Sequence, residues 1–256
     1  MLLDGLDRVR DQLDGRADWS RRWAAAWRYA GSEVVCPVRD LGSMPAAGCE
    51  PIRRFGWRRG QRHRPGLQFL VSTGRHHGFE SLAEARLLLA LDFAGDLMDV
   101  LAQPLRLRYV SGAGPREHVP DFLAFTRANR WLIDVRPAAR VGRDDLVAFA
   151  ATAEVALTLG WRYEVVTGWR SPVASTLDAL SAQRRPLTDP LGMVAQIRAA
   201  LAAGPRPFAM IAEATSPAPV ARALLLHLLW HRQLGMDRSR ALGDATLVRA
   251  AEGWLR

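Results

Sequence analysis

Three acidic residues and one arginine stand in an order that could bind a divalent metal ion. Pro120-Asp121 begins one predicted strand, Asp134-Val135-Arg136 ends the next, and Glu84 precedes both on a predicted helix. Carboxylate oxygens on rigid strands are the hard ligands that Mg²⁺ prefers, with positions left for water and a phosphate oxygen. A cation beside them, here Arg136, would stabilise negative charge on a phosphodiester under attack. The pattern therefore indicates metal-assisted hydrolysis of a phosphodiester.

The relative placement of these residues can be predicted from the turn between the two strands. We expect Arg127 to pair with Arg130 across a two-residue turn, which places Asp121 opposite Arg136. Because side chains alternate along a strand, Asp134 and Arg136 share one face of the sheet. Two carboxylates and a cation are thus predicted to meet on one patch.

The elements that must position these residues follow from the hydrophobic pattern. Ser81 is predicted to cap a helix that runs to about Ala94, where Gly95 ends it. After this helix we expect a meander of three strands, a second helix and a further strand. These predicted elements cover, in order, residues 105–110, 118–126, 131–136, 144–159 and 163–167. The fold class is therefore α/β, with a mixed sheet flanked by helices.

This order of residues resembles a known nuclease signature. In restriction-endonuclease-like nucleases, Pro-Asp is followed by Asp or Glu, any residue and Lys, and an acidic residue precedes them on a helix. The surrounding sequence is similar to TnsA, the cutting subunit of heteromeric transposases, over residues 79–169, with a weaker similarity at 224–237. The segments that carry this resemblance are EARLLLALDF at 84–93, DLMDV at 96–100 and QPL at 103–105.

The resemblance implies both an activity and a set of partners. Glu84, Asp121 and Asp134 would hold one or two Mg²⁺ or Mn²⁺ ions, with Arg136 beside them. The protein would be a metal-dependent DNA endonuclease subunit that hydrolyses one strand at transposon ends, while a transposase subunit of the DDE type cuts the other. A TnsC-like ATPase regulator would contact its C-terminal domain. The family also has a glutamine in the turn where Gln103 stands here.

Arg136 is a departure from the family, which has lysine at this position. Lysine can lose its proton to activate water, whereas arginine stays charged and cannot act as a base. Arg136 still offers charge stabilisation, so an active nuclease is expected. The alternative is a catalytically inactive DNA-binding or assembly subunit of the same fold.

Ordinary structural roles remain open for several of these residues. Glu84 lies three residues after Ser81, which is also the spacing of a helix capping box. The aspartates could belong to a polar stripe on a half-buried sheet. His227 and His231 stand one helical turn apart without an evident third ligand, so packing is the expected role.

The charge of the chain favours a polyanionic partner such as DNA. The formal net charge is +9 and the sequence pI is about 11.0, and every basic residue other than histidine is arginine. A basic segment with interleaved aromatic residues is a candidate DNA contact, and a solvated surface loop is the alternative. Its candidate contact residues are Arg53, Arg54, Trp57, Arg58, Arg59, Arg62 and Arg64.

We expect four parts along the chain. They are an N-terminal helical and basic extension (1–70), a restriction-endonuclease-like nuclease domain (71–170), a linker that contains a short helix (171–190) and a small winged-helix-like domain (191–256). Residues 4–29 are predicted to form one or two helices, and the C-terminal domain is predicted to contain helices at 193–203 and 216–233.

The sequence predicts a cytoplasmic protein without a membrane segment. Residues 1–4 lack the pattern of a secretion signal, and the apolar run at 224–230 is too short to cross a bilayer. Cys36 and Cys49 could form a disulfide, but reduced thiols are the expectation in this compartment.

Overall fold

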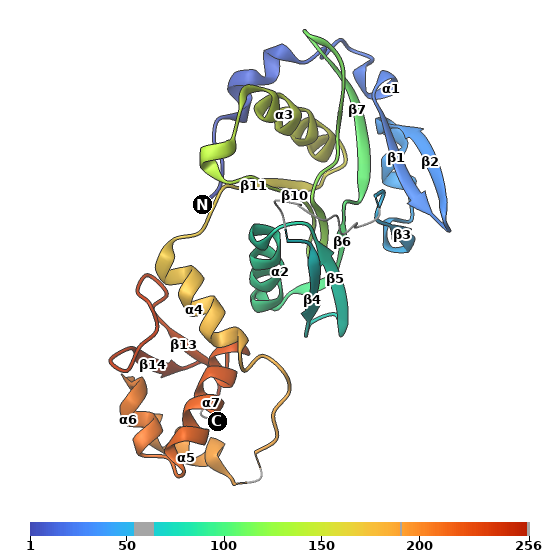
Figure 1. The fold of residues 1–256 in the computed structure, drawn as a ribbon. Helices are drawn as coiled ribbons and strands as arrows, with labels where there is room; N and C mark the ends of the chain where they lie inside the picture. The colour runs from blue at the N-terminus through green and yellow to red at the C-terminus, as the bar shows by residue number, and fades with distance from the viewer. Residues whose placement is uncertain (54–63, 190, 255–256) are drawn as a thin grey trace. The chain divides into compact units, whose positions relative to one another are not determined.

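The computed structural model describes residues 1–53, 64–189 and 191–254, and the chain forms two compact units, Met1–Gly168 and Trp169–Arg256 (Figure 1). The fold is mixed α/β with several largely antiparallel sheets, in agreement with the predicted class. Across the described chain, no helix combines the length and apolar character that crossing a membrane requires. The boundary between the units lies close to the predicted end of the nuclease domain at residue 170.

The first sheet of unit 1 is built largely from the N-terminal residues. Its strands follow the order β2-β1-β7-β8, all antiparallel, and the short β3 also pairs with β1. The bounds are β1 (Ala24–Tyr29), β2 (Ser32–Pro37), β3 (Cys49–Glu50), β7 (Leu105–Ser111) and β8 (Gly114–His118).

The predicted helices at 4–29 are wrong for most of that segment. It holds a 3-10 helix η1 (Leu6–Gln12), one turn of α-helix α1 (Trp19–Arg22) and then β1. Strand β1 lies between β2 and β7, where three consecutive residues are buried, so strand pairing overrides the local helical pattern. Two further 3-10 helices, Val38–Ser43 and Ala46–Gly48, complete the segment before residue 53.

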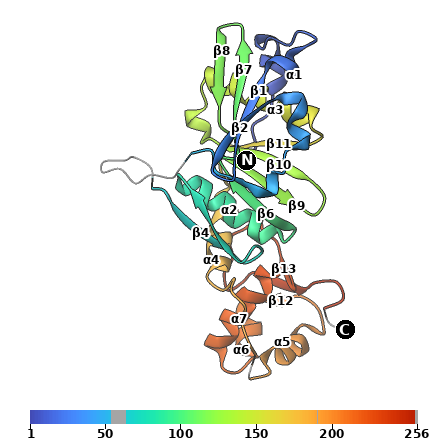
Figure 2. The ribbon, with the colours of Figure 1, turned by 90° about the vertical axis from the view of Figure 1, so that its right-hand side faces the viewer.

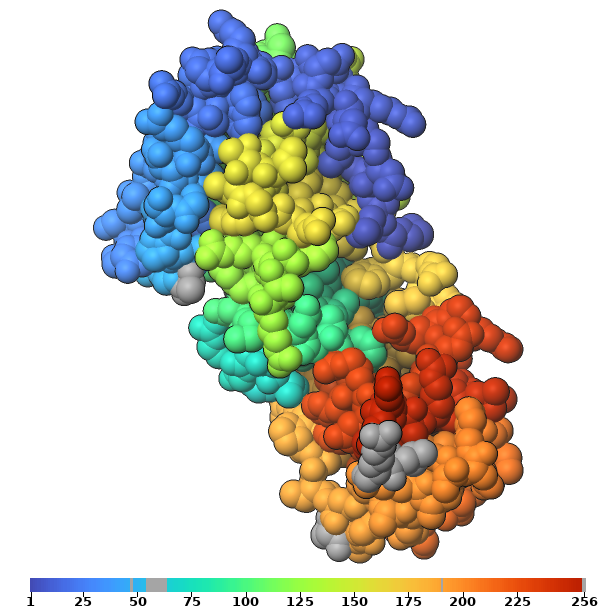
Figure 3. Space-filling view, turned by 180° about the vertical axis from the view of Figure 1, so that it is seen from behind, coloured from blue at the N-terminus to red at the C-terminus, as the bar shows by residue number. Residues whose placement is uncertain are grey.

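The N-terminal segment is part of unit 1 and not a separate extension. Figure 3 shows it beside α3 (Arg143–Thr158), and an ion pair of 2.7 Å joins Arg10 to Glu154 of that helix. The Leu3 amide donates to the Val165 carbonyl at 3.0 Å. Residues 1–70 and the predicted nuclease domain therefore belong to one compact unit. The expected boundary at residue 70 was drawn from composition, which does not reveal contacts between residues distant in the chain.

The second sheet of unit 1 carries the acidic residues. Its order is β11-β10-β9-β6; β10 and β11 are parallel and joined through α3, and the other pairs are antiparallel. The bounds are β6 (Leu97–Ala102), β9 (Phe122–Thr126), β10 (Arg130–Val135) and β11 (Arg162–Val166), with a 3-10 turn at Ala138–Arg140 after β10.

The predicted meander and its register both need correction. Residues 118–126 are split: β8 ends at His118 in the first sheet, and β9 begins at Phe122 in the second. Pro120 lies in the break and, lacking an N–H group, cannot donate a ladder hydrogen bond. The expected pairing of Arg127 with Arg130 is wrong, because Arg130 pairs with Phe125.

A four-residue turn causes the shift in register. The Thr126 hydroxyl donates to the Asn129 carbonyl and accepts from the Asn129 amide, both at 3.0 Å. The ladder pairs Leu123 with Leu132, so the same register continued past β9 brings Asp121 level with Asp134. Two carboxylates therefore face each other where a carboxylate and an arginine were expected.

Helix α2 (Leu82–Ala94) confirms the predicted helix. The Ser81 side chain caps it by accepting from the Glu84 amide, and Gly95 ends it in the left-handed conformation with φ 82°. A hairpin of β4 (Gly66–Leu70) and β5 (Arg75–Phe79) precedes the helix.

The main core of unit 1 lies between its two sheets around α3. Trp27 and Leu107 enter it from the first sheet, Leu123 and Leu132 from the second, and Ala151 from α3; all are buried. This shared core fixes the second sheet relative to α3, which matters for the site described below.

Unit 2 has helices packed around a small antiparallel sheet of order β12-β14-β13 (Figure 2). The predicted helices at 193–203 and 216–233 are confirmed as α5 and α7, whereas the sheet was not predicted. The bounds are α4 (Ser171–Ser181), α5 (Met193–Leu201), β12 (Arg206–Pro207), α6 (Phe208–Glu213), α7 (Ala218–Trp230), β13 (Leu234–Met236) and β14 (Leu247–Ala250).

The predicted linker at 171–190 was expected to contain a short helix, and it does. Helix α4 fills its first half and packs against α7. Pro172 stands in the first turn of α4, where a proline disturbs no helical hydrogen bond, so it starts a helix where the prediction had taken it as a break. Residues 182–189, which contain Pro186, have no regular structure.

Candidate active site

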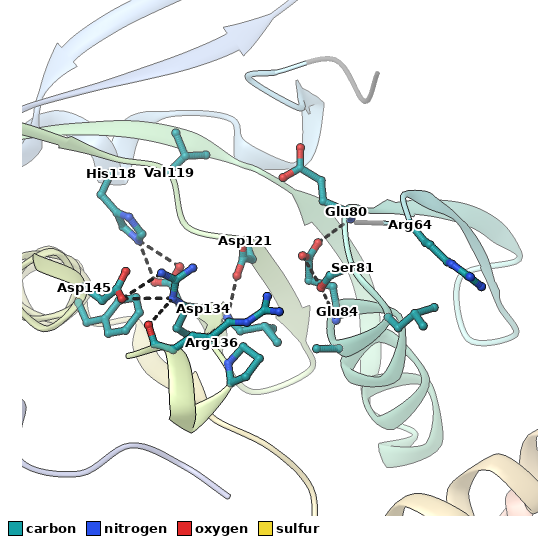
Figure 4. Close-up of a pocket in the computed structure, with 16 residues that line it drawn as sticks. Arg64, Glu80, Ser81, Glu84, His118, Val119, Asp121, Asp134, Arg136 and Asp145 are labelled. Carbon is teal, nitrogen blue, oxygen red and sulfur yellow. Dashed lines mark hydrogen bonds and ion pairs between the residues drawn. The ribbon is translucent and has the colours of Figure 1, made fainter. Parts of the chain in front are cut away.

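A cavity of about 550 Å³ in unit 1 brings together all four residues of the predicted site. Glu84 reaches it from the first turn of α2, Asp121 from the turn before β9, and Asp134 and Arg136 from the end of β10 (Figure 4). They are separated by up to 52 positions in the sequence, so tertiary folding alone assembles them.

Asp121 lies between the other two carboxylates. Its Oδ2 accepts a hydrogen bond of 2.7 Å from the Val135 amide, and Figure 4 shows it between Asp134 and Glu84. Burial raises the pKa of Asp121 well above its ordinary value, and the charges of Asp134 and Glu84 raise it further. A proton or a bound cation is therefore needed to stabilise this arrangement at neutral pH.

Asp134 is the most firmly held carboxylate of the site. It is 3% exposed, and the His118 Nε2 lies 3.0 Å from each of its oxygens. The Tyr163 hydroxyl donates to its Oδ2 at 2.6 Å. Burial acts to lower the pKa of His118, but the charge of Asp134 and the hydrogen bond to it outweigh burial and raise that pKa.

Glu84 lines the cavity and also forms the capping box that its spacing from Ser81 predicted. Its Oε2 accepts from the Glu80 amide at 2.8 Å while its Oε1 accepts from the Ser81 hydroxyl at 2.8 Å. The Ser81 Oγ in turn accepts from the Glu84 amide at 3.2 Å. The carboxylate thus faces the start of its own helix in this structure.

Arg136 is fixed by a partner that the sequence analysis did not identify. Its Nε lies 3.2 Å from the Asp145 Oδ2 and 3.3 Å from the Arg140 carbonyl, and its Nη2 also lies 3.2 Å from the Asp145 Oδ2. Asp145, in the first turn of α3, accepts from the Gly142 amide at 2.9 Å. The only sequence signal for Asp145 was the cluster of acidic residues that starts a helix.

The donor set suits a hard divalent cation, although the site is not preformed. Within the part of the chain that the structure describes, no three His, Cys, Asp or Glu side chains converge closely enough to hold a metal ion. Asp121 and Asp134 already face each other with oxygen donors; burial first, and then the charges of Asp134 and Glu84, raise the pKa of Asp121, and a bound cation would offset both effects. Glu84 would complete the set by rotating away from its cap.

The family resemblance also pointed to Gln103, which acts through its main chain. It does not line the cavity; its amide donates to the Asp121 carbonyl at 2.7 Å, and its backbone is left-handed with φ 46°. This bond anchors the turn that carries Asp121. The Gln103 side chain lies near Arg53, whose Nε is 3.4 Å from its Oε1.

Two of the predicted DNA contacts can be placed. Arg64 lines the cavity, and Arg53 forms an ion pair of 3.4 Å with Glu80, which also lines it. The other five, Arg54, Trp57, Arg58, Arg59 and Arg62, lie outside the described residues.

His227, His231 and the two cysteines lie outside this cavity. His227 and His231 contact the carbonyls of Gln183 and Arg184 at 2.8 and 3.1 Å, which agrees with a packing role. Cys36 and Cys49 are free thiols, and burial raises the pKa of both.

Comparison with known proteins adds no relative to this picture: no protein-family model matches the chain, and no curated protein matches it significantly. The function must be inferred from the chain's own residues, chiefly those that line this cavity.

Proposed function

We propose that the chain is a metal-dependent DNA endonuclease subunit similar to TnsA, which hydrolyses one strand at transposon ends. The convergence of Glu84, Asp121, Asp134 and Arg136 on one cavity carries the proposal. An exposed polar stripe would not bury Asp134 or crowd two carboxylates against each other. Such crowding destabilises a fold without a counterion, so a site for a cation explains it best.

The residues divide the chemistry between them. Asp121, Asp134 and, after rotation, Glu84 would hold Mg²⁺ or Mn²⁺, which supplies an acidified water and polarises the phosphodiester when bound. Arg136 stays charged and stabilises the negative charge that develops on the phosphate. Arg136 contacts Asp145 and Arg140 through its Nε and Nη2 atoms. Its other guanidinium N–H groups can donate to a phosphate oxygen.

The finer fold assignments belong to the same proposal. The β6-β9-β10-β11 sheet with α2 and α3 supports a restriction-endonuclease-like fold for unit 1. In unit 2, the order α5-β12-α6-α7-β13-β14, with β14 central in the sheet, supports a winged-helix-like domain. This domain would contact a TnsC-like ATPase regulator, and a DDE-type transposase subunit would cut the second strand. The proposed site of action is the cytoplasm.

The charge of the chain supports DNA as the substrate. The net charge is +9, and Arg64 and Arg140 line the cavity together with Arg136. Arginines at the mouth of a site that binds a divalent metal provide phosphate contacts on either side of the bond to be cut.

Nicking of end-containing DNA in Mg²⁺ or Mn²⁺, with and without the partner proteins, tests the proposal. Asp121→Ala is expected to abolish cutting while DNA binding, measured in EDTA, stays within about twofold of wild type, because binding depends on the arginines. An unchanged cutting rate would contradict the assignment of the site.

The alternative function is an inactive DNA-binding or assembly subunit of the same fold. The observation in its favour is that Arg136 cannot act as a base and is tied to Asp145. Wild-type protein that binds DNA but does not cut it with either metal and both partners present would establish this alternative.

A further inference from the structure

One face of α3 lies behind the candidate site. Asp145, Phe149 and Thr152 are spaced four and three residues apart, which places them on the same side of the helix. Asp145 holds Arg136, and the Phe149 ring packs edge-on against His118 with ring centres 5.9 Å apart. Thr152 is fully buried on the same face. The helix therefore supports the arginine side and the carboxylate side of the cavity at once.

Within the described residues, the side chain of Asp134 is hydrogen-bonded to two residues that are far away in sequence. His118 is 16 residues before it, at the end of β8 in the other sheet, and Tyr163 is 29 residues after it, on β11. Strands β10 and β11 are parallel, with Leu132 paired to Tyr163, so the tyrosine lies one side-chain step along the same face from Asp134. Two separate elements thus clamp one carboxylate.

The Tyr163 hydroxyl forms hydrogen bonds with two side chains, Asp134 on β10 and Thr152 on α3. Burial of the hydroxyl end raises the pKa of Tyr163 well above its ordinary value, and the neighbouring Asp134 charge raises it further. An ionised carboxylate has about four lone-pair sites, so the three contacts with His118 and Tyr163 leave room for a metal ion.

We propose that Tyr163 and His118 are positioning residues that hold Asp134 in the orientation in which it binds the divalent metal. This inference rests on the proposed function, since it gives Asp134 its partner. A carboxylate that is already oriented loses little rotational freedom when the metal binds, so the clamp increases metal affinity. Neither residue touches the phosphodiester in this assignment, and both act through Asp134.

Tyr163→Phe tests the clamp most cleanly, because it removes one oxygen and keeps the ring. Mn²⁺ binding to the full chain, followed by calorimetry and by the electron paramagnetic resonance of free Mn²⁺, should weaken by about 10- to 100-fold, the usual effect of losing a hydrogen bond to a metal ligand. Cutting should need correspondingly more Mn²⁺ and should recover toward the wild-type rate when Mn²⁺ is saturating.

Tyr109→Phe is the matched control. Tyr109 is a buried tyrosine of the same unit, on β7, and does not line the cavity. It should leave Mn²⁺ affinity unchanged, and comparison of its melting temperature with that of Tyr163→Phe separates lost positioning from general destabilisation. Should Tyr163→Phe fail to fold, His118→Ala provides the second test, with a loss of the same order expected because it removes the other arm of the clamp.

Asp134→Asn separates the failure of this inference from that of the function. If wild-type protein binds no Mn²⁺, the metal site and the clamp are both refuted. If wild type binds Mn²⁺ and Asp134→Asn does not, but Tyr163→Phe binds as tightly as wild type, the metal site stands and the clamp is refuted. Weaker binding by Tyr163→Phe alone among the two tyrosine variants supports the clamp.

Discussion

The two sides of the cavity are held in different ways. On the helix side, Glu84 accepts hydrogen bonds from Glu80 and Ser81, which lie within four residues of it. On the strand side, Asp134 is bonded to residues 16 and 29 positions away, on elements of two different sheets. The capping bonds of the helix side can thus form within one helix, whereas the bonds of the strand side form only in the folded unit.

This difference indicates which part of the site must move. Asp134 is clamped and Asp121 is tied to the backbone of β10, so both are already in place for a cation. Glu84 forms a capping box with Ser81, and the loss of a helix cap costs about 1 kcal/mol. A metal ion that binds the two aspartates would have to draw Glu84 out of this cap, and the following predictions test whether Glu84 is a ligand or only a cap.

The largest expected effect comes from separating the two roles of Glu84. Glu84→Gln keeps an oxygen that can accept from the Glu80 amide, but it removes the charged ligand. Cutting is expected to fall by on the order of a hundredfold, since a metal contributes several kcal/mol to such a reaction.

Ser81→Ala is the matched control on the same turn. It should lower the free energy of unfolding by about 1 kcal/mol and leave cutting nearly intact, because it removes the cap and a hydrogen bond to Glu84 that metal binding would break in any case. Rates and urea unfolding curves for the two variants provide the measurement. Full activity in Glu84→Gln would mean that Glu84 is a cap and nothing more.

A smaller effect is expected at Arg136, where the nucleases that the sequence resembles have lysine. Arg136→Lys should lower the cutting rate by roughly tenfold, because an ammonium group cannot hold Asp145 and a phosphate oxygen in two directions as a guanidinium does. Single-turnover rates in saturating Mn²⁺ measure this. A large increase in rate would instead show that arginine impairs the natural enzyme.

The mildest test concerns pH and the crowded aspartates. The pKa of Asp121 is raised in the folded protein above its ordinary value of 3.8, so its contribution to stability is complete below that value and is lost as pH rises through the raised pKa. In EDTA, the melting temperature of Asp121→Asn should fall less with rising pH than that of wild type, because asparagine does not ionise. Its side-chain oxygen can still accept from the Val135 amide, so the local structure is kept. Thermal melting across pH measures this, and parallel curves for the two proteins would argue against the shift.

Much of the local structure could be predicted from the sequence. Ser81, the apolar run after it and Gly95 define α2 completely, because an N-cap, a helical face and a left-handed C-cap are all properties of neighbouring residues. The residue types of the site were identified for the same kind of reason. Three carboxylates followed by a cation, in the order Glu84, Asp121, Asp134 and Arg136, indicate a metal site. Each of these residues stands near the end of an element whose hydrophobic pattern is strong.

The register and the partners could not be predicted in this way. The turn at 126–129 depends on a Thr126 side-chain bond that shifts the pairing, and β1 depends on strands on both sides of it. His118, Asp145 and Tyr163 are ordinary residues in the sequence, and they reach the site only because two sheets and α3 share one core.

The sequence by itself therefore determined the chemical groups and the short elements that carry them, since both depend on residue type and near neighbours. Tertiary structure alone decided that Asp121 faces Asp134, that Tyr163 and His118 contact Asp134, and that Arg136 forms an ion pair with Asp145. The physical reason is range: capping and periodicity act over a few residues, whereas burial and strand pairing depend on contacts between residues that are distant in the chain.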